Sequence, residues 1–353
     1  MCGRRARVGV LLIVVLLLPA VAAGGCGSNR TKLTVLCAGS LIVPFDQLAQ
    51  EFETAHPGID VAVEGHGSIQ VVREVTELHK EADVMVVADR SLLPMLMYGH
   101  KVPGSAEDYA NWYIRFATNR LGIAYTSQSK YAAEIGSANW YEVLSRPDVK
   151  LGISDPRIDS CGYRALMVCQ LAEDDYTDNT ILERVMGDFS PPITVSDNIE
   201  AHVIAVPETV KPKKVTMRGY SVTLLSLLES GDLDYCFEYE SVARQRGLGF
   251  VELPPEIDLG SREFADRYGQ VAVKMDFQRF ASINPEFRGE PIQYALTIPT
   301  NSPHRDAAIQ FVEFLLGSDG QTIFLESYQP TLVPPEADNP ANMPASLRSL
   351  LQE

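Results

Sequence analysis

The chain has 353 residues, of which 46% are hydrophobic, and it carries 46 acidic against 30 basic side chains for a net charge of −16. A chain of this length is longer than the chains that usually fold around one hydrophobic core, so we expect two domains. The acidic excess excludes binding to nucleic acid or to an anionic membrane through the overall electric field.

The first 25 residues have the features of a secretory signal. Three arginines precede an apolar run over residues 8–19, and small residues at 22–25 follow it. Cys26 comes directly after these small residues, which predicts a lipid anchor on Cys26 and a short tether over residues 26–31, with ordinary cleavage as the alternative. Without the three arginines, the exported chain keeps 27 basic and 46 acidic side chains, a charge of about −19.

Two strand–turn–helix units open the exported chain. Apolar residues at 32–36 predict a strand that runs into Gly39 and Ser40, and a second strand over 60–63 runs into Ser68. The helix after the first strand is indicated by apolar residues at helical spacing: Phe45, Leu48, Ala49 and Phe52. A helix over 71–79 follows Ser68. Because open α/β sheets bind ligands at the carboxyl ends of parallel strands, the two glycine–serine turns predict half of a binding site.

Later segments predict the rest of the architecture. The apolar run 82–88 is typical of a central parallel strand that is covered on both faces. A strand-rich segment over 112–124 predicts a crossing from one lobe to the other, and 234–240 predicts the return crossing. The last periodic segment predicts a helix that ends at Gly317 and packs on the first lobe through Ala308, Phe311, Val312 and Leu315.

The turn residues offer hydrogen-bond donors to a bound anion. Such a site needs many neutral donors, because each unsatisfied anion oxygen loses about 1 to 3 kcal/mol of hydrogen bonding. Ser40 and Ser68 beside glycines supply hydroxyl and backbone N–H donors, although a single serine in such a place is more often a helix cap. Asp159 opens the next helical segment, where capping is again the alternative to a ligand contact.

Several segments resemble the tungstate/molybdate-binding proteins that serve ABC importers. They are Ala38-Gly39-Ser40, LGISDPRIDSCGYRALMVCQ from 151, ESGDLDYCFEYESVARQRGL from 229 and QYALTIPTNSPHRDAAIQFVEFLL from 293. The resemblance covers residues 33–331 and implies an α/β, two-lobed periplasmic-binding-protein fold of type II, each lobe a mainly parallel sheet flanked by helices. We expect the first lobe at 32–115 and 240–335, the second at 116–239, and a C-terminal tail at 336–353.

The resemblance also implies a set of ligand-binding residues. They are Gly39, Ser40, Ser68, Asp159, Ser160, Cys161, Ser221 and Tyr239. In the family an aspartate at the place of Asp159, together with a glutamate further along the chain, binds the molybdenum or tungsten centre of the oxyanion directly. Ser221 stands at the place of that glutamate, so this sequence lacks the second carboxylate and full six-fold coordination is in doubt.

Some polar residues have alternative interpretations. Arg164 and Arg218 are candidates for an anion clamp, but we favour salt bridges on the lobe surface. Four cysteines remain in the exported part: Cys37, Cys161, Cys169 and Cys236. A disulfide between Cys37 and Cys161 is conceivable, and buried free thiols are the alternative that we favour.

The leading hypothesis is a monomeric solute receptor that carries molybdate or tungstate to an ABC permease, with a membrane lipid anchor and no cofactor. Another oxyanion such as sulfate is the close alternative, because Ser221 replaces an acid. An exported enzyme that uses Asp159 as a general acid or base is the alternative from another class, and it requires a second titratable group nearby.

Overall fold

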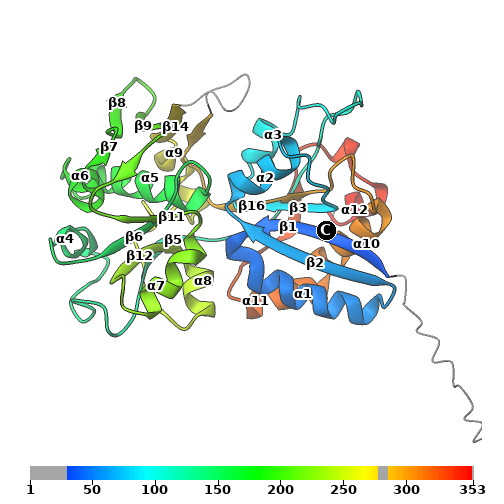
Figure 1. Cartoon of the computed structure of the whole chain (residues 1–353), viewed down its shortest axis with the longest axis horizontal. Helices are drawn as coiled ribbons and strands as arrows, with labels where there is room; N and C mark the ends of the chain where they lie inside the picture. Colours follow the sequence, from blue (N-terminus) through cyan, green and yellow to red (C-terminus); the bar gives the residue numbers. More distant parts are fainter. Residues whose placement is uncertain (1–29, 277–284, 352–353) are drawn as a thin grey trace, which may run out of the picture.

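The computed structural model describes residues 30–276 and 285–351, which form two lobes side by side (Figure 1). The expected signal and Cys26 lie outside the described residues. In Figure 1 the first lobe contains the blue, cyan, orange and red segments, and the second lobe contains the green and yellow segments. The two-lobed α/β architecture expected from the sequence is thus confirmed.

The first lobe is built on a six-stranded sheet of order β17-β4-β16-β3-β1-β2. Its elements are β1 (Thr31–Ala38), η1 (Gly39–Leu41), α1 (Ile42–Ala55), β2 (Ile59–His66), α2 (Ser68–Thr76), β3 (Val84–Val87), α3 (Leu92–Leu96), β4 (Ile114–Thr118), β16 (Gln293–Thr297), α10 (Arg305–Leu316), α11 (Ser318–Glu326), β17 (Thr331–Ala337), η4 (Pro340–Asn342) and α12 (Ala345–Ser349). Strand β1 pairs in parallel with β2 and β3, whereas β16, β4 and β17 add antiparallel pairs. The sheet is therefore mixed rather than mainly parallel, because the chain returns from the second lobe in the opposite direction.

Two of the helices predicted for this lobe pack against each other. Helix α1 buries the predicted stripe Phe45, Leu48, Ala49 and Phe52, and α10 buries Ala308, Phe311, Val312 and Leu315. The rings of Phe52 and Phe311 meet edge to face with their centroids 5.1 Å apart. Such aromatic contacts stabilise a fold by about 0.5 to 1.5 kcal/mol beyond the contribution of the apolar area that they bury.

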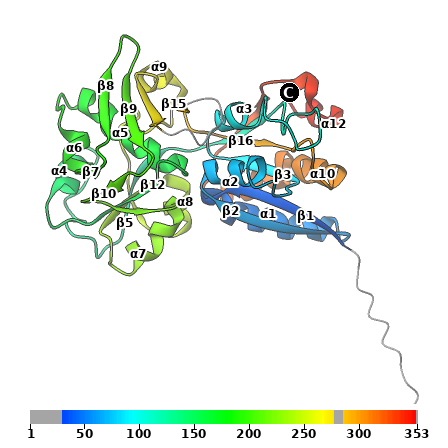
Figure 2. The ribbon, with the colours of Figure 1, turned by 45° about the horizontal axis from the view of Figure 1, so that its top comes forward.

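The second lobe contains a five-stranded sheet of order β11-β6-β12-β5-β13 and a four-stranded sheet of order β15-β14-β9-β8. Its elements are β5 (Leu121–Tyr125), α4 (Trp140–Ser145), β6 (Leu151–Ser154), α5 (Ser160–Asp175), α6 (Ile181–Met186), β7 (Phe189–Ser190), β8 (Thr194–Asp197), β9 (His202–Pro207), β10 (Lys211–Pro212), β11 (Thr216–Arg218), η2 (Ser221–Leu224), α7 (Leu225–Glu229), β12 (Tyr235–Tyr239), α8 (Glu240–Gln245), β13 (Gly249–Val251), η3 (Arg262–Phe264), α9 (Ala265–Tyr268), β14 (Val271–Asp276) and β15 (Glu286–Arg288). Figure 2 shows β8, β9 and β15 on the side of this lobe above the five-stranded sheet.

The first crossing between the lobes matches the expected one, and the second does not. Strand β4 belongs to the first lobe and β5 to the second, so the chain crosses at residues 119–120. The expected return at 234–240 is instead β12, a buried strand inside the second lobe's sheet. Strand β13 pairs with β5, and the chain returns only between β15 and β16. Residues 240–276 and β15 therefore lie with the second lobe.

The expected C-terminal tail is also part of the first lobe. Strand β17 runs to Ala337 and pairs with β4 at the sheet edge. The Asp338 carboxylate then accepts hydrogen bonds from the backbone N–H of Tyr113 at 2.8 Å and from the hydroxyl of Tyr98 at 2.7 Å. These contacts bind residues after 336 to the lobe instead of leaving them as a separate tail.

Candidate functional site

The two glycine–serine turns of the first lobe lie at the carboxyl ends of adjacent parallel strands, as predicted. Ser40 follows β1 and Ser68 follows β2, and both side chains are buried. Neither hydroxyl caps its helix. The Ser68 hydroxyl accepts from the backbone N–H of Ala88 at 3.0 Å, which leaves its own proton available, and the Ser40 hydroxyl lies 3.0 Å from the hydroxyl of Tyr294.

The second lobe contributes the start of α5 and the end of β12. Asp159 precedes α5, and its carboxylate accepts from the backbone N–H of Ser221 at 3.1 Å across to η2. The hydroxyls of Ser160 and Tyr239 lie 3.2 Å apart. The Cys161 thiol donates to the carbonyl of Phe237 at 3.6 Å, so its side chain is directed into the lobe. Asp159 and Ser221 thus form one hydrogen-bonded pair of predicted site residues, and Ser160 and Tyr239 form another.

All four cysteines of the described chain are free and buried. Burial raises the pKa of the Cys161 thiol well above its ordinary value, and it does the same for Cys169 and Cys236. The thiols act as small apolar groups in the core. The conceivable disulfide between Cys37 and Cys161 is not formed.

Several contacts join the two lobes at this place. The backbone N–H of Gln70 in α2 donates to the carbonyl of Ile158 in the second lobe at 3.3 Å. A Cβ added at Gly67 would lie 2.4 Å from the Ile158 oxygen and 3.1 Å from the Asp159 Cβ. The glycine thus allows the backbones of the lobes to touch, and the serine turns of the first lobe come to lie beside the start of α5. The two lobes are thus in direct contact beside these residues.

Arg164 differs from the expectation of a surface salt bridge. It is only 2% exposed, and its guanidinium lies 3.3 Å from the Asp89 carboxylate of the first lobe. It also donates to the carbonyl of Ala88 at 2.8 Å and to the hydroxyl of Tyr239 at 2.9 Å. Burial raises the pKa of Asp89, but Arg164 and the hydrogen bonds to this carboxylate outweigh that effect and lower it. Arg218, in contrast, is exposed.

Glu238 is a site residue that the sequence analysis missed. Its side chain is fully buried, and its Oε1 atom accepts from the Ser221 hydroxyl at 2.9 Å and from the backbone N–H of Tyr239 at 2.8 Å. Its Oε2 atom is buried and has no hydrogen-bond partner among the described residues. Burial raises the pKa of Glu238 to about 8 and that of Asp159 to about 6. A glutamate inside the otherwise apolar strand β12 was the signal available in the sequence.

The first lobe supplies two further polar groups that the sequence analysis did not single out. The Asn119 amide, at the crossing between the lobes, donates to the hydroxyl of Tyr294 at 3.1 Å and to that of Ser241 at 2.8 Å. Tyr294 in turn contacts Ser40, and its ring centroid lies 6.2 Å from that of Tyr239. Ser40 of the first lobe is thereby connected through Tyr294 and Asn119 to Ser241 of the second lobe.

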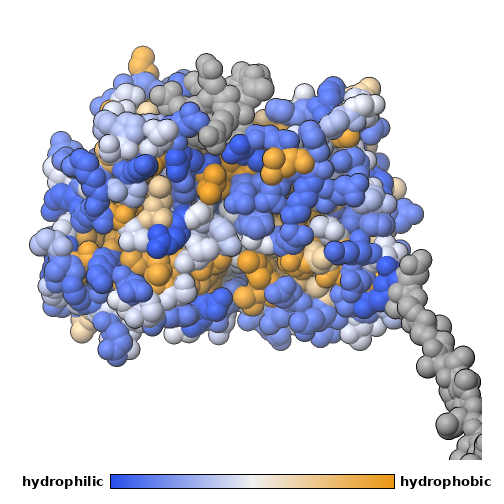
Figure 3. Space-filling model, in the orientation of Figure 1, coloured by the Kyte–Doolittle hydropathy of each residue, from blue (hydrophilic) through white to orange (hydrophobic). Residues whose placement is uncertain are grey.

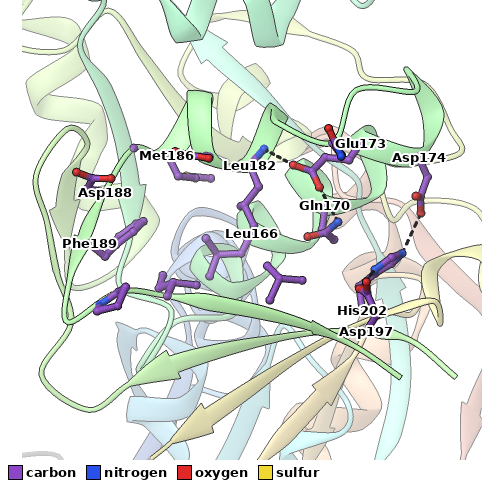
Figure 4. A pocket seen from close by; sticks show the side chains of 16 residues that line it. Leu166, Gln170, Glu173, Asp174, Leu182, Met186, Asp188, Phe189, Asp197 and His202 are labelled. Atoms are coloured by element: carbon purple, nitrogen blue, oxygen red, sulfur yellow. Dashed lines mark hydrogen bonds and ion pairs between the residues drawn. The ribbon is translucent and has the colours of Figure 1, made fainter. Parts of the chain in front are cut away.

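A separate pocket of about 510 Å³ lies in the second lobe, beside α5, α6 and the β8–β9 hairpin (Figure 4). Glu173 there accepts from the backbone N–H of Leu182 and from the Gln170 amide, and His202 lies between Asp174 and Asp197. The residues that line this pocket include no predicted ligand-binding residue. It is distinct from the cluster at the lobe interface.

The outer surface gives no sign of a membrane span. Among residues 30–276 and 285–351, no helix has the length and apolarity to cross a bilayer. The face in Figure 3 is mainly hydrophilic, with hydrophobic side chains in a band across its lower middle.

Relatives with curated descriptions match nearly the whole chain. Two proteins named molybdate/tungstate-binding protein WtpA, from Thermococcus kodakarensis and Pyrococcus abyssi, are 38% and 39% identical and each covers 98% of this chain, which in turn spans 97% and 98% of them. An uncharacterized solute-binding protein of Methanoculleus marisnigri is 42% identical, with 92% of this chain and 88% of that protein covered.

Solved structures share the fold at low identity. The periplasmic molybdate-binding protein of Azotobacter vinelandii matches with a TM-score of 0.53 and 16% identity, over 84% of this chain and 98% of that one. The sulfate-binding protein SubI of Mycobacterium tuberculosis matches with a TM-score of 0.55 and 15% identity, over 86% and 88%. The model of the bacterial extracellular solute-binding protein family matches residues 33–328. The chain belongs to this family of extracellular solute-binding proteins.

Proposed function

We propose that this protein captures molybdate or tungstate between its two lobes and delivers the ion to the permease of an ABC importer. The observation that carries the proposal is the cluster of buried hydroxyls at the closed lobe interface, with Ser40 and Ser68 on one side and Ser160 and Tyr239 on the other. Neutral donors in a closed site replace the water around an oxyanion without adding a fixed charge. The printed names of the two WtpA relatives support the same ligand.

Each predicted residue has a role in this proposal. Ser40, Ser68, Ser160 and Tyr239 donate hydroxyl hydrogen bonds to the oxyanion oxygens. Gly39 and Cys161 contribute backbone N–H groups at the starts of η1 and α5, where such groups attract anions. Asp159 approaches the molybdenum or tungsten centre directly. Ser221 holds the backbone N–H that orients the Asp159 carboxylate at 3.1 Å.

The protein performs no reaction on the ion in this proposal. Glu238 does provide the second titratable group near Asp159 that an enzyme would need, but membership of a solute-binding family favours capture and release. We further propose that the exported chain works as a monomer and is held on a membrane surface outside the cytoplasm by a lipid on Cys26.

Sulfate is the competing ligand. Ser221 in place of an acid removes one feature that separates molybdate and tungstate from sulfate, because a carboxylate repels an anion that it cannot coordinate. Asp159 remains as a carboxylate that repels sulfate. We therefore expect discrimination against sulfate to be present, and to depend on Asp159.

The test is ligand-dependent stabilisation of the mature protein. Molybdate and tungstate should raise the melting temperature, with about 4 kcal/mol of added stability at a ligand concentration a thousandfold above Kd. Sulfate at equal concentration should give a much smaller shift, and chloride serves as the control for ionic strength. Unchanged melting with all three oxyanions would rule out the receptor function. A larger shift with sulfate than with tungstate would leave the receptor intact and replace its ligand.

A further inference from the structure

Glu238 has one satisfied and one unsatisfied carboxyl oxygen. Oε1 accepts two hydrogen bonds, from the Ser221 hydroxyl at 2.9 Å and from the Tyr239 N–H at 2.8 Å, as the carbonyl oxygen of a neutral carboxylic acid does. Oε2 is buried without a partner among the described residues. A buried polar atom left unpaired costs free energy, so such an atom in a native site indicates a missing partner. That partner must accept a hydrogen bond if the acid is protonated.

The groups around Glu238 favour its protonated form. Asp159 faces it from the start of α5, Cys161 from α5 and Tyr294 from β16 of the first lobe, while Cys236 and Tyr239 flank it on β12. None of these groups is basic, and Glu238 forms no ion pair within the described chain. Burial and the Asp159 charge raise the pKa of Glu238, and the bonds from Tyr239 and Ser221 oppose this only in part. The surroundings of Glu238 thus favour its neutral form over the carboxylate.

Glu238 is tied to residues on which the proposed function rests. Ser221 connects it to Asp159, because the Ser221 N–H donates to Asp159 while the Ser221 hydroxyl donates to Glu238. Tyr239 follows it in the chain, and the Tyr239 hydroxyl lies 3.2 Å from that of Ser160. A dianion held by these hydroxyls would be repelled by a second ionised carboxylate, whereas a protonated one offers it a strong donor.

We propose that Glu238 contacts the bound oxyanion as a neutral carboxylic acid, with its Oε2–H donating a hydrogen bond to one ligand oxygen. This inference rests on the proposed function, and it assigns a carboxyl group to the site from β12, although position 221 carries serine. Glu238 then makes capture sensitive to pH. Binding requires the protonated form, so affinity is retained below the pKa and lost as pH rises above it.

The test compares Glu238→Gln and Glu238→Met with the wild type by calorimetric titration of molybdate and tungstate at pH 7 and pH 9. Both ions are dianions at these pH values, so changes in affinity report on the protein. Wild-type affinity should fall about tenfold from pH 7 to pH 9, as expected for a pKa near 8. Glu238→Gln keeps a carbonyl acceptor and gains an N–H donor, so it should bind within about threefold of the wild type at pH 7 and show a flat profile to pH 9. Glu238→Met should bind about ten- to a hundredfold more weakly at both values.

Glu173→Gln is the matched control, because Glu173 is a half-buried glutamate of the same lobe in the separate pocket of Figure 4. It should reproduce the wild-type affinity and pH profile. Wild-type binding combined with a loss in Glu238→Gln as large as in Glu238→Met would overturn the inference, since a carboxylate that coordinates the metal would then be required. An unchanged affinity in Glu238→Met would overturn it too, since no contact would exist. If the wild type binds no oxyanion, the proposed function itself fails, and this inference with it.

Melting of the ligand-free protein gives a second, independent measurement. The native protein binds the Glu238 proton more tightly than the unfolded chain does, so this residue makes the wild type less stable as pH rises from about 4.5 to about 8. Glu238→Gln lacks this proton, and its melting temperature relative to the wild type should therefore rise across that interval. A constant difference between the two proteins would show that Glu238 is ionised throughout and overturn the inference.

Discussion

Single hydroxyl groups at the lobe interface differ in how free they are to donate. The Ser68 hydroxyl already accepts from Ala88, so its proton is available for a ligand, whereas the Ser40 hydroxyl is already hydrogen-bonded to the Tyr294 hydroxyl, with either oxygen able to donate. We predict that Ser68→Ala weakens molybdate binding by about 1 to 3 kcal/mol without unfolding the protein, and that Ser40→Ala has the smaller effect. Calorimetric titration measures both, with Ser226→Ala at an exposed position of α7 as the control. Normal binding by both variants would mean that the serines only support the local backbone.

Sequence predicts the place of a single residue when that place depends on the neighbouring strand and turn. Ser40, Ser68 and Asp159 stand at turns after strands, and the structure places them at the lobe interface as expected. Glu238 and Arg164 could not be found in this way, because their partners lie elsewhere in the chain. Glu238 meets Ser221 from 17 positions away, and Arg164 meets Asp89 across the two lobes. A charged residue within a buried element is the general sign of such a partner.

Helices and strands also differ in how far local sequence predicts them. The spacing of apolar side chains predicts α1 and α10 together with the faces that they bury. Strand pairing is a property of the assembled sheet, and sequence gives no local sign that Gly249 of β13 pairs with Tyr125 of β5, far earlier in the chain. The predicted return at 234–240 therefore failed, although the strand itself is present as β12.

The turn between β2 and α2 controls how closely the lobes approach. Gly67 has φ −61° and ψ 141°, which alanine adopts without strain, so a methyl group there meets only the opposite lobe, 2.4 Å from the Ile158 oxygen. We predict that Gly67→Ala weakens ligand binding at least about tenfold, because the methyl group opposes closure and only an open form accommodates it. Gly58→Ala, which meets nothing within 4 Å, is the matched control in the same titration. Equal affinity in both variants would show that this contact does not limit closure.

Polar contacts join the two lobes at several places along their interface. Arg164 and Tyr163 of the second lobe bind Asp89 of the first, Arg164 also donates to the Ala88 carbonyl, and Gln70 donates to the Ile158 carbonyl. Gln245 donates to the Ser327 carbonyl, and Arg262 pairs with Glu336. A receptor that releases its ligand by opening must break contacts of this kind. The ligand shifts the equilibrium between the open and closed forms by its stronger binding to the closed form.

Substitution of Asp89 tests the equilibrium between the open and closed forms most directly. In the closed form Arg164 is buried, and removal of its partner leaves an unpaired charge that costs about 3 to 5 kcal/mol. Opening exposes Arg164 to water and relieves this cost, so Asp89→Asn should enlarge the radius of gyration of the ligand-free protein and weaken apparent affinity by about ten- to a hundredfold. Small-angle X-ray scattering with and without tungstate measures the first effect, and titration measures the second. Asp148→Asn, which removes an exposed ion pair with Lys130 on the second lobe, should change neither. Unchanged scattering and affinity in Asp89→Asn would show that the pair does not hold the lobes together, and that the ligand alone decides between the open and closed forms.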